Sequence, residues 1–218
     1  MRRKRIAIIG GTGQEGFGLA LRWARAGHRI LIGSRSPHRA EDATRRLLSL
    51  IPSAQVQGLP NEQAAEQAEI VVLTIPYSAQ GGILPALREA VRGKIVVDVT
   101  VPLLSKRPLV VDRPAAGSAA ERAKQLLGEE VQLVSGFHTV SGYLLSRLDE
   151  PLEGDVLICG DAEEAKQEVI ALAQDLGARG FNVGPLRNAG VLEHLGGLLI
   201  GLNLLYKRRA IGIKLTGI

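Results

Sequence analysis

The chain has very few cysteine and aromatic residues. Of its 218 residues, one is a cysteine and 3% are aromatic. A lone cysteine excludes an intramolecular disulfide framework and a cysteine-based zinc cluster, and we expect no metal site. Because Cys159 lies in the apolar run Val156 to Cys159, we expect a buried thiol on a strand. The shortage of aromatic side chains argues against a base-stacking surface for nucleic acid.

Long hydrophobic runs are also missing. The longest candidate for a membrane span, Leu198 to Tyr206, is too short and contains Asn203. The basic start resembles that of a signal peptide, but the apolar run behind it ends after four residues at Gly10. We therefore expect a cytoplasmic protein without a membrane-spanning segment.

The composition is that of an ordinary globular protein with a basic surface. Hydrophobic residues make up 45% of the chain, charged residues 22%, and the formal net charge is +5. The length fits one large domain, or one domain with a small appendage. Most of the positive residues are scattered along the chain, so a small anionic ligand is sufficient to account for the charge.

The chain is organised around the stretch from Arg5 to Arg39. An apolar run, Ile6 to Ile9, predicts a buried parallel strand, and the glycines that follow it fit G-x-G-x-x-G at Gly11, Gly13 and Gly16. A helical pattern begins at Phe17, and a second strand follows, from Arg29 to Gly33. Together they form a βαβ unit, in which this motif binds the pyrophosphate of a dinucleotide. A glycine-rich tight turn without a ligand is the alternative reading.

The end of the second strand indicates which dinucleotide binds. An NAD site usually has a carboxylate there for the ribose 2′-hydroxyl. This chain instead has Ser34, Arg35 and Arg39, and no carboxylate before Glu41. Arginine pairs with phosphate in a fork, so this set favours the 2′-phosphate of NADP. The alternative is that both arginines are solvated loop residues.

Three later strands are predicted to end at the same sheet edge. Ile70 to Ile75 ends at Pro76, and Lys94 to Val99 is followed by Thr100, Val101 and Pro102. Val131 to Ser135 leads to His138, which we expect close to the cofactor as the candidate catalytic residue. A histidine bonded to a neighbouring carbonyl is the alternative. The segment Leu104 to Ala116, which contains Pro108, predicts a long loop facing the substrate.

These patterns predict an α/β protein with a Rossmann-type doubly wound parallel sheet over residues 1–150. Residues 151–218 predict a small C-terminal α/β domain that contributes to the substrate pocket and to a dimer contact. Its last helix, Ala189 to Tyr206, carries Gly196, Gly197 and Gly201 close to one side. Small residues at this spacing permit close packing, within the chain or across a homodimer. The segment Ile211 to Lys214 is expected to return to the cofactor face.

Several motifs occur together and in order: GGTGQEGFGLALR, the strand end GSR, LTIPY, GFHTVSG, CGD at Cys159 and IGIK near the C-terminus. With them, the sequence resembles the NADPH-dependent reductases of the deazaflavin coenzyme F420, over Arg5 to about Leu215. The resemblance implies direct hydride transfer between NADP(H) and F420, with the two rings stacked and no covalent intermediate.

The resemblance also implies roles for individual residues. Thr12, Ser34, Arg35 and Arg39 would hold the 2′-phosphate, and Gly13, Gln14 and Glu15 would hold the pyrophosphate, within the turn that Gly11 and Gly16 shape. The residues at the strand ends, Ile75, Pro76, Val101 and Pro102, would flank the nicotinamide. His138, Thr139 and Val140 would line the deazaflavin side.

Two other functions fit the same residues. One is an NADPH-dependent reductase of another acceptor, such as a flavin, a ferric chelate or an imine. The other is a non-catalytic module that binds NADP(H) and reports the redox state to a partner. A sensor would bind the cofactor tightly without turnover, and it would have no need of a second open pocket beside the cofactor.

Overall fold

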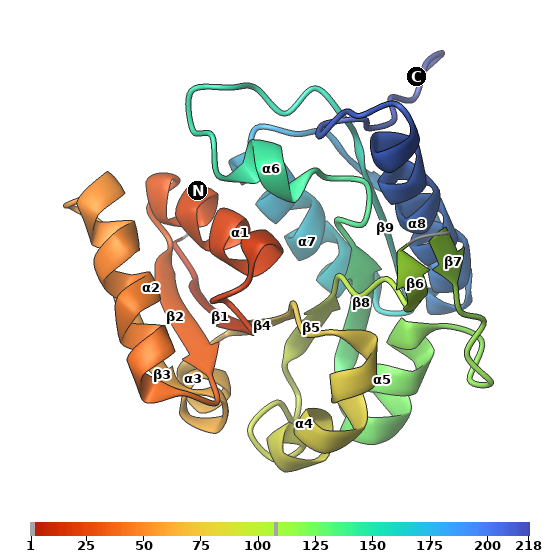
Figure 1. The fold of residues 1–218 in the computed structure, drawn as a ribbon. Helices are drawn as coiled ribbons and strands as arrows, with labels where there is room; N and C mark the ends of the chain where they lie inside the picture. Colours follow the sequence, from red (N-terminus) through yellow and green to blue (C-terminus); the bar gives the residue numbers. More distant parts are fainter. Residues whose placement is uncertain (1–2, 107–108) are drawn as a thin grey trace.

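The computed structural model describes residues 3–106 and 109–218 of the chain. An eight-stranded sheet runs through the molecule, with helices on both of its faces (Figure 1). In spatial order the strands are β10 (Gly180–Asn182), β9 (Val156–Gly160), β8 (Gln132–Gly136), β5 (Ile95–Asp98), β4 (Ile70–Leu73), β1 (Arg5–Ile9), β2 (Arg29–Ser34) and β3 (Val56–Pro60).

Two hydrophobic clusters, one on each face, join the helices to the sheet. The first contains residues of α1 (Gln14–Arg25), α2 (Pro37–Leu50), α6 (Gly142–Leu145) and α7 (Glu163–Asp175). The second contains residues of α3 (Asn61–Gln67), α4 (Gln80–Leu87), α5 (Ala119–Leu127) and α8 (Ala189–Leu205). Short 3₁₀ turns, η1 (Tyr77–Ala79) and η2 (Leu186–Asn188), precede α4 and α8. The continuous apolar strands of the centre are therefore buried on both sides, as parallel strands require.

Within the eight-stranded sheet, the pairing is parallel except between β8 and β9. Those two strands run antiparallel, with Ser135 opposite Cys159. The strands after residue 150 thus extend the first sheet, while the division of the chain into two domains stays a prediction. Cys159 is fully buried, and burial raises the pKa of its thiol to about 12, so the expected inert strand position is confirmed.

The prediction of a loop from Leu104 to Ala116 is wrong for the first half of this segment. A hairpin forms there from β6 (Leu103–Lys106) and β7 (Leu109–Val111), while Pro108 lies outside the described residues. The β-branched pair Val110 and Val111 was the available strand signal, and the hairpin packs on α8, a contact between distant segments that local patterns do not show.

Helix α8 (Ala189–Leu205) confirms the predicted apolar helix from Ala189 to Tyr206 to within one residue. Leu186–Leu205 would be long and apolar enough to cross a membrane by length and composition alone. Glu193 of this helix is nevertheless fully buried, and its carboxylate accepts hydrogen bonds from the backbone N–H groups of Ala119 and Ala120 in α5, at 2.9 and 3.0 Å. These are the contacts of a helix that packs into the core of a protein.

Candidate functional site

The candidate site residues gather along one edge of the sheet. They lie in the loops that follow the carboxyl ends of the strands, or in the first turn of the next helix. This is the edge where open α/β sheets bind ligands. After β1 come Gly11, Thr12, Gly13, Gln14, Glu15 and Gly16; after β2, Ser34 itself, Arg35 and Arg39; after β4, Ile75 and Pro76; after β5, Val101 and Pro102; after β8, His138, Thr139 and Val140.

The glycines of the first loop serve different physical purposes. Gly10 takes a φ of +84°, a conformation that favours glycine. A Cβ on Gly11 would lie 2.9 Å from the Ile8 carbonyl oxygen, and one on Gly16 would collide with the Thr74 hydroxyl. Gly13 alone is exposed, with no protein atom closer than 3.5 Å to its Cβ position. Gly11 and Gly16 therefore permit close backbone packing, whereas Gly13 leaves room for a ligand.

The first turn of α1 has no side-chain cap. Its N-cap residue is Gly13, whereas Ser36 caps α2 and Ser118 caps α5 through their hydroxyls. Uncapped amides at a helix N-terminus, next to a partial positive charge, are suited to a phosphate. The donors of this turn and the open space above Gly13 fit the pyrophosphate of a dinucleotide.

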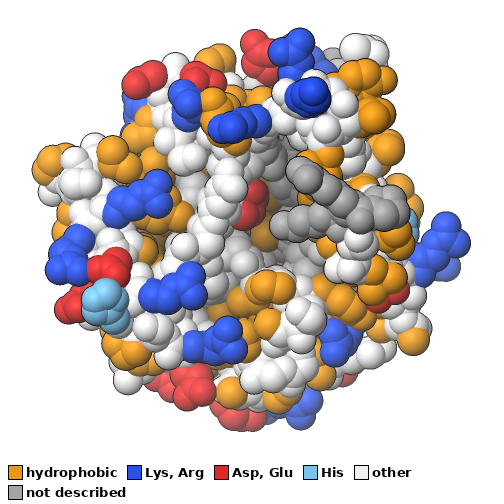
Figure 2. Space-filling view, in the orientation of Figure 1, with side chains coloured by type: hydrophobic (Ala, Val, Ile, Leu, Met, Phe, Trp, Pro, Cys, Tyr) orange, Lys and Arg blue, Asp and Glu red, His pale blue; other side chains and the backbone are white. Residues whose placement is uncertain are grey.

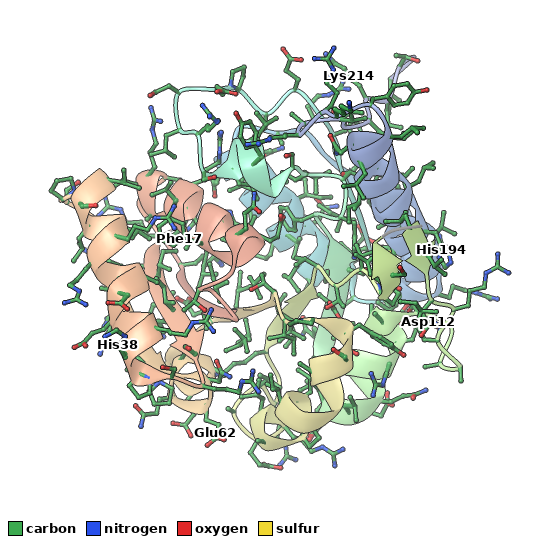
Figure 3. All side chains as sticks on the ribbon, viewed as in Figure 1. Phe17, His38, Glu62, Asp112, His194 and Lys214 are labelled. Carbon is green, nitrogen blue, oxygen red and sulfur yellow. The ribbon has the colours of Figure 1, made fainter. Side chains whose placement is uncertain are left out.

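The residues after β2 form a cationic cluster at one end of the edge. The Ser34 hydroxyl is buried and accepts from the Ser36 N–H at 3.1 Å. Arg35 and Arg39 are exposed, and within the described residues neither guanidinium makes a hydrogen bond or ion pair. Next to them His38 points outward from α2 and pairs with Asp42 at 2.9 Å (Figure 3). Two free guanidiniums beside a hydroxyl suit a phosphate group.

Hydrogen bonds fix the loops after β4 and β5. The Thr74 hydroxyl donates to the Ile9 carbonyl at 2.9 Å. Asp98, the last residue of β5, is buried and accepts from the Thr100 N–H at 2.7 Å and from Gln80 at 3.2 Å. Burial raises the pKa of Asp98 to about 6, and the bonds from Thr100 act against that shift. The loop that carries Val101 is thus tied to the strand that precedes it.

A cavity of about 640 Å³ opens beside the first turn of α1. Figure 2 shows this face of the molecule hollowed near its centre, with Lys and Arg side chains around the hollow. Of the predicted site residues, Gln14, Glu15, Val101, His138, Thr139 and Val140 line the cavity. Ser34, Arg35, Arg39, Ile75, Pro76 and Pro102 do not line it, and the cationic cluster lies further along the edge.

The His138 imidazole is a neutral group at this cavity. Burial lowers its pKa to about 4, and neither ring nitrogen has a hydrogen-bond partner among the described residues. A Cβ on Gly196 of α8 would lie 2.9 Å from both the Cβ and the carbonyl oxygen of His138, so the helix backbone closes over this residue. Phe137 before it has a φ of 67° and packs edge-on against Trp23, which fixes the start of the loop.

The second wall of the cavity comes from α6, α8 and the C-terminal tail, and most of it was missed in the sequence. Asn203 and Leu199 lie on the cavity side of α8, together with Gly196 and Ile200. The spacing of these four residues is typical of one face of a helix, and it could have indicated from the sequence that they lie together. Ile211 also lines the cavity, which confirms that the segment from Ile211 returns to this face. The remaining residues that were missed are Val99, Phe137, Ser141, Gly142, Tyr143, Leu204, Arg208 and Arg209.

Backbone contacts hold this second wall in place. The Thr139 hydroxyl donates to the Asp155 carbonyl at 2.7 Å, and the Asp155 carboxylate accepts from Arg179 and from the Leu215 N–H. The Arg179 guanidinium holds the pKa of Asp155 below its usual range. On the other side, Arg22 of α1 donates to backbone carbonyls of residues 144, 145, 147, 150 and 176, at 2.7 to 3.3 Å.

The arrangement therefore combines a glycine loop, an uncapped helix N-terminus, a cationic cluster at one end and an open cavity at the other. No three His, Cys, Asp or Glu side chains are grouped as metal ligands in the part of the chain that the structure describes. The fold and this edge together define the class of protein, a Rossmann-type dinucleotide-binding protein.

Comparisons with known proteins give the particular family. The family model described as "NADP oxidoreductase coenzyme F420-dependent" matches residues 5–102. An F420-dependent NADP reductase of Methanocaldococcus jannaschii is 39% identical over 98% of this chain and 99% of its own. One from Methanothermobacter marburgensis is 37% identical over the same shares. A crystal structure described as an F420-dependent NADP reductase of Arthrobacter sp. FB24 superposes with a TM-score of 0.83, at 25% identity, over 98% of this chain and 99% of that one. The chain belongs to the F420-dependent NADP oxidoreductase family.

Proposed function

We propose that this protein transfers a hydride directly between NADP(H) and the deazaflavin coenzyme F420. The observation that carries the proposal is the relationship to F420-dependent NADP reductases, which extends over nearly the whole chain and not only over its nucleotide-binding part. The cavity agrees with it, because a second ring has room beside the nicotinamide end of the sheet edge.

The dinucleotide would lie along the edge from the cationic cluster to the cavity. Arg35 and Arg39, with Ser34 and Thr12, would hold the 2′-phosphate, since the free guanidiniums can pair with it in a fork. Gly13, Gln14 and Glu15 would hold the pyrophosphate, with the uncapped N–H groups of Gln14 and Glu15 as donors, since the Gly13 N–H already donates to the Gly10 carbonyl at 3.0 Å. The nicotinamide would then lie next to Ile75, Val101 and the prolines that follow them.

The acceptor ring would enter between the loop after β8 and helix α8. His138, Thr139 and Val140 line that side. Hydride transfer needs two rings held face to face in a site without water, and it needs no nucleophile. A neutral His138 suits a hydrogen-bonding role toward the acceptor, whereas the Thr139 hydroxyl already donates to Asp155 and helps to shape the wall. Arg208 and Arg209 at the cavity suit an anionic acceptor.

A spectrophotometric assay tests the function. Purified protein is mixed with NADPH and oxidised F420, and the loss of deazaflavin absorbance is followed. We expect a loss that depends on both protein and NADPH and is much slower with NADH. Free flavin, a ferric chelate and a cyclic imine serve as competing acceptors in parallel reactions. The proposal would be contradicted if the protein reduced one of these acceptors but not F420. It would also be contradicted if the protein bound NADPH tightly and reduced no acceptor.

We also propose a homodimer and a cytoplasmic location. The outer side of α8 exposes Val191, Leu198 and Leu205, which are 69, 55 and 71% exposed and spaced seven residues apart. Leu104 of the neighbouring hairpin is 65% exposed, and hydrophobic side chains are visible along this side of the molecule in Figure 2. A second copy of the chain would cover this face. Reduction of soluble coenzymes is consistent with the cytoplasm.

A further inference from the structure

The carboxyl group of Glu15 is a chemically unusual part of the cavity wall. Glu15 is the second residue of α1, and it is the one carboxylate among the described residues that line the cavity. Its Oε1 atom is shielded from solvent and has no hydrogen-bond partner in the described part of the chain. A Cβ on Gly142 would lie 2.6 Å from its Oε2 atom, so the carboxyl group fills the space between α1 and α6.

Among the described residues, no cation makes an ion pair or hydrogen bond with this carboxyl group. Arg22, on the same helix, is occupied by the backbone carbonyls near α6, and His28 at the far end of α1 pairs with Asp175 of α7. The other titratable groups that face the cavity make no hydrogen bond or ion pair with Glu15 within the described residues; they are His138, Tyr143, Arg208 and Arg209. Burial alone raises the pKa of Glu15 to about 8. The group is therefore protonated and neutral at pH 7.

The course of the dinucleotide brings its nicotinamide end to Glu15. If the 2′-phosphate lies at Arg35 and the pyrophosphate at the first turn of α1, the nicotinamide half of the dinucleotide extends toward β5 and β8. That direction leads into the cavity that Glu15, Val99 and Val101 line. When bound, this half supplies the hydride, and its ring is neutral when reduced and positively charged when oxidised. The ring charge thus changes next to a buried, unpaired carboxyl group.

We propose that Glu15 is a charge partner of the nicotinamide that stays protonated beside NADPH and ionises beside NADP+. The O–H bond of the carboxyl breaks, its electron pair stays on the carboxylate oxygen, and the proton passes to water, so nothing is oxidised or reduced in this step. The inference rests on the proposed NADP site but not on the identity of the acceptor. It makes the preference of the protein for the oxidised or reduced cofactor depend on pH.

The physical basis is the electrostatic free energy of the ionised Glu15 carboxylate in a site that water solvates poorly. A carboxylate alone is disfavoured there, whereas a carboxylate beside a cation is stabilised, and more strongly than in water. By linkage, the affinity for NADP+ should rise by up to about tenfold per pH unit below pH 8, while the affinity for NADPH stays nearly constant. Above that pH the affinity for NADP+ should level off.

The experiment measures proton release on binding, without any acceptor present. Protein at pH 7 in a weak buffer with a pH indicator is titrated with NADP+ and, separately, with NADPH. Both carry the same 2′-phosphate, so the difference between them isolates the nicotinamide charge. We expect NADP+ to release close to one more proton per site than NADPH. In Glu15→Gln this difference should vanish, and the pH dependence of the NADP+ affinity should flatten.

Glu193→Gln is the matched control, because Glu193 is also a buried carboxyl group with a raised pKa but lies outside the cavity lining. It should keep the difference in proton release. Equal release by both cofactors in the unmodified protein, or an undiminished difference in Glu15→Gln, would overturn the role of Glu15 while leaving the NADP site intact. Failure of both cofactors to bind would overturn the proposed function as well. The comparison in the unmodified protein holds even if a variant folds poorly.

Discussion

Side chains that make no contact inside the protein are the ones that remain available to a ligand. In the cluster after β2, the Ser34 hydroxyl already accepts a bond from the Ser36 N–H, whereas the guanidiniums of Arg35 and Arg39 are exposed and unpaired among the described residues. Removing them therefore costs the fold little, since surface positions of this kind contribute little to stability. Their effect should be visible in binding alone.

Replacing Arg35 and Arg39 together with Ala should weaken NADPH binding by about 1.5–3 kcal/mol for each charge-assisted contact. NADH lacks the 2′-phosphate, so its affinity should change little. Titration calorimetry with both cofactors measures this difference. Arg29→Ala, on an exposed position of β2 away from the carboxyl edge, is the control. Equal losses for NADPH and NADH would place the 2′-phosphate elsewhere.

His138 should remain neutral at all pH values where the enzyme is folded and active. Its pKa, lowered to about 4 by burial, predicts imidazole NMR signals that do not shift above pH 5.5. The chain has four histidines, so comparison with His138→Asn assigns the signals. Figure 3 shows His38 and His194 on opposite sides of the molecule, and these serve as internal references. A His138 signal that titrates near pH 6.5 would contradict the burial of this ring.

At the scale of elements, the contact between α8 and the hairpin depends on glycine. A Cβ on Gly197 would collide with Val111 of β7, and one on Gly201 would lie 3.0 Å from Leu109. The sequence predicted close packing of this helix, and the structure shows the partner to be the hairpin within the same chain. That partner could not be found from the sequence, because Pro108 and Pro114 in the segment are typical of a loop and the contact joins residues far apart in the chain.

Gly197→Ala should therefore destabilise the protein by roughly 1–3 kcal/mol, the usual cost of overpacking. Gly82 of α4 offers the opposite case, because nothing lies within 4 Å of its Cβ position. Gly82→Ala should stabilise by about 0.5–1 kcal/mol, since alanine favours a helix. Urea denaturation of the two variants measures both effects. Changes of the same sign would show that α8 does not approach the hairpin so closely.

The elements of the nucleotide half were predictable because each carries a local signal. Two continuous apolar runs, the glycine turn and Ser34 with its two arginines lie within 35 residues of one another. The cavity wall was harder to predict. Glu15 meets Gly142, and Thr139 meets Asp155, through packing between segments far apart in the sequence. Only the strand ends and the spacing on α8 could have indicated them, and nothing local predicts an unpaired buried carboxyl group.

For the molecule as a whole, three buried carboxyl groups oppose folding as they ionise. Burial raises the pKa of Glu15 to about 8, of Glu193 to about 7 and of Asp98 to about 6. In the unfolded chain these groups lose their protons near pH 4. The folded state thus binds more protons than the unfolded state between these values, and stability falls as pH rises through that range. His138, with its lowered pKa, acts in the opposite direction below about pH 6.5.

The unfolding free energy should accordingly decrease between pH 6.5 and pH 8, the range in which Glu15 and Glu193 lose most of their protons in the folded state. Urea unfolding of the cofactor-free protein at both pH values measures it. Glu15→Gln should reduce the slope, because glutamine has no proton to lose. A stability that rises over this interval would mean that the two carboxyl groups are better solvated than the structure shows.

The proposed dimer can be tested at the same scale. Leu198→Lys combined with Leu205→Lys would place two charges on the exposed side of α8, where a partner would have to bury them. We expect the pair to halve the mass measured by light scattering while each monomer keeps its fold. The single exposed change Glu62→Gln on α3 is the control, far from α8 (Figure 3). A monomeric unmodified protein would contradict the homodimer.

The way in which Arg22 holds α6 has a consequence for the sequence changes that the protein can tolerate in evolution. This guanidinium binds only main-chain carbonyls, which every amino-acid sequence supplies. The junction between the nucleotide half and the opposite wall therefore tolerates change in the wall, while the phosphate-facing cluster after β2 lies on a separate stretch of chain. Exchange of residues 144–150 with those of a relative is thus expected to yield a folded hybrid with an unchanged dinucleotide preference, whereas exchange of α8 would also have to preserve its contacts with α5 and the hairpin.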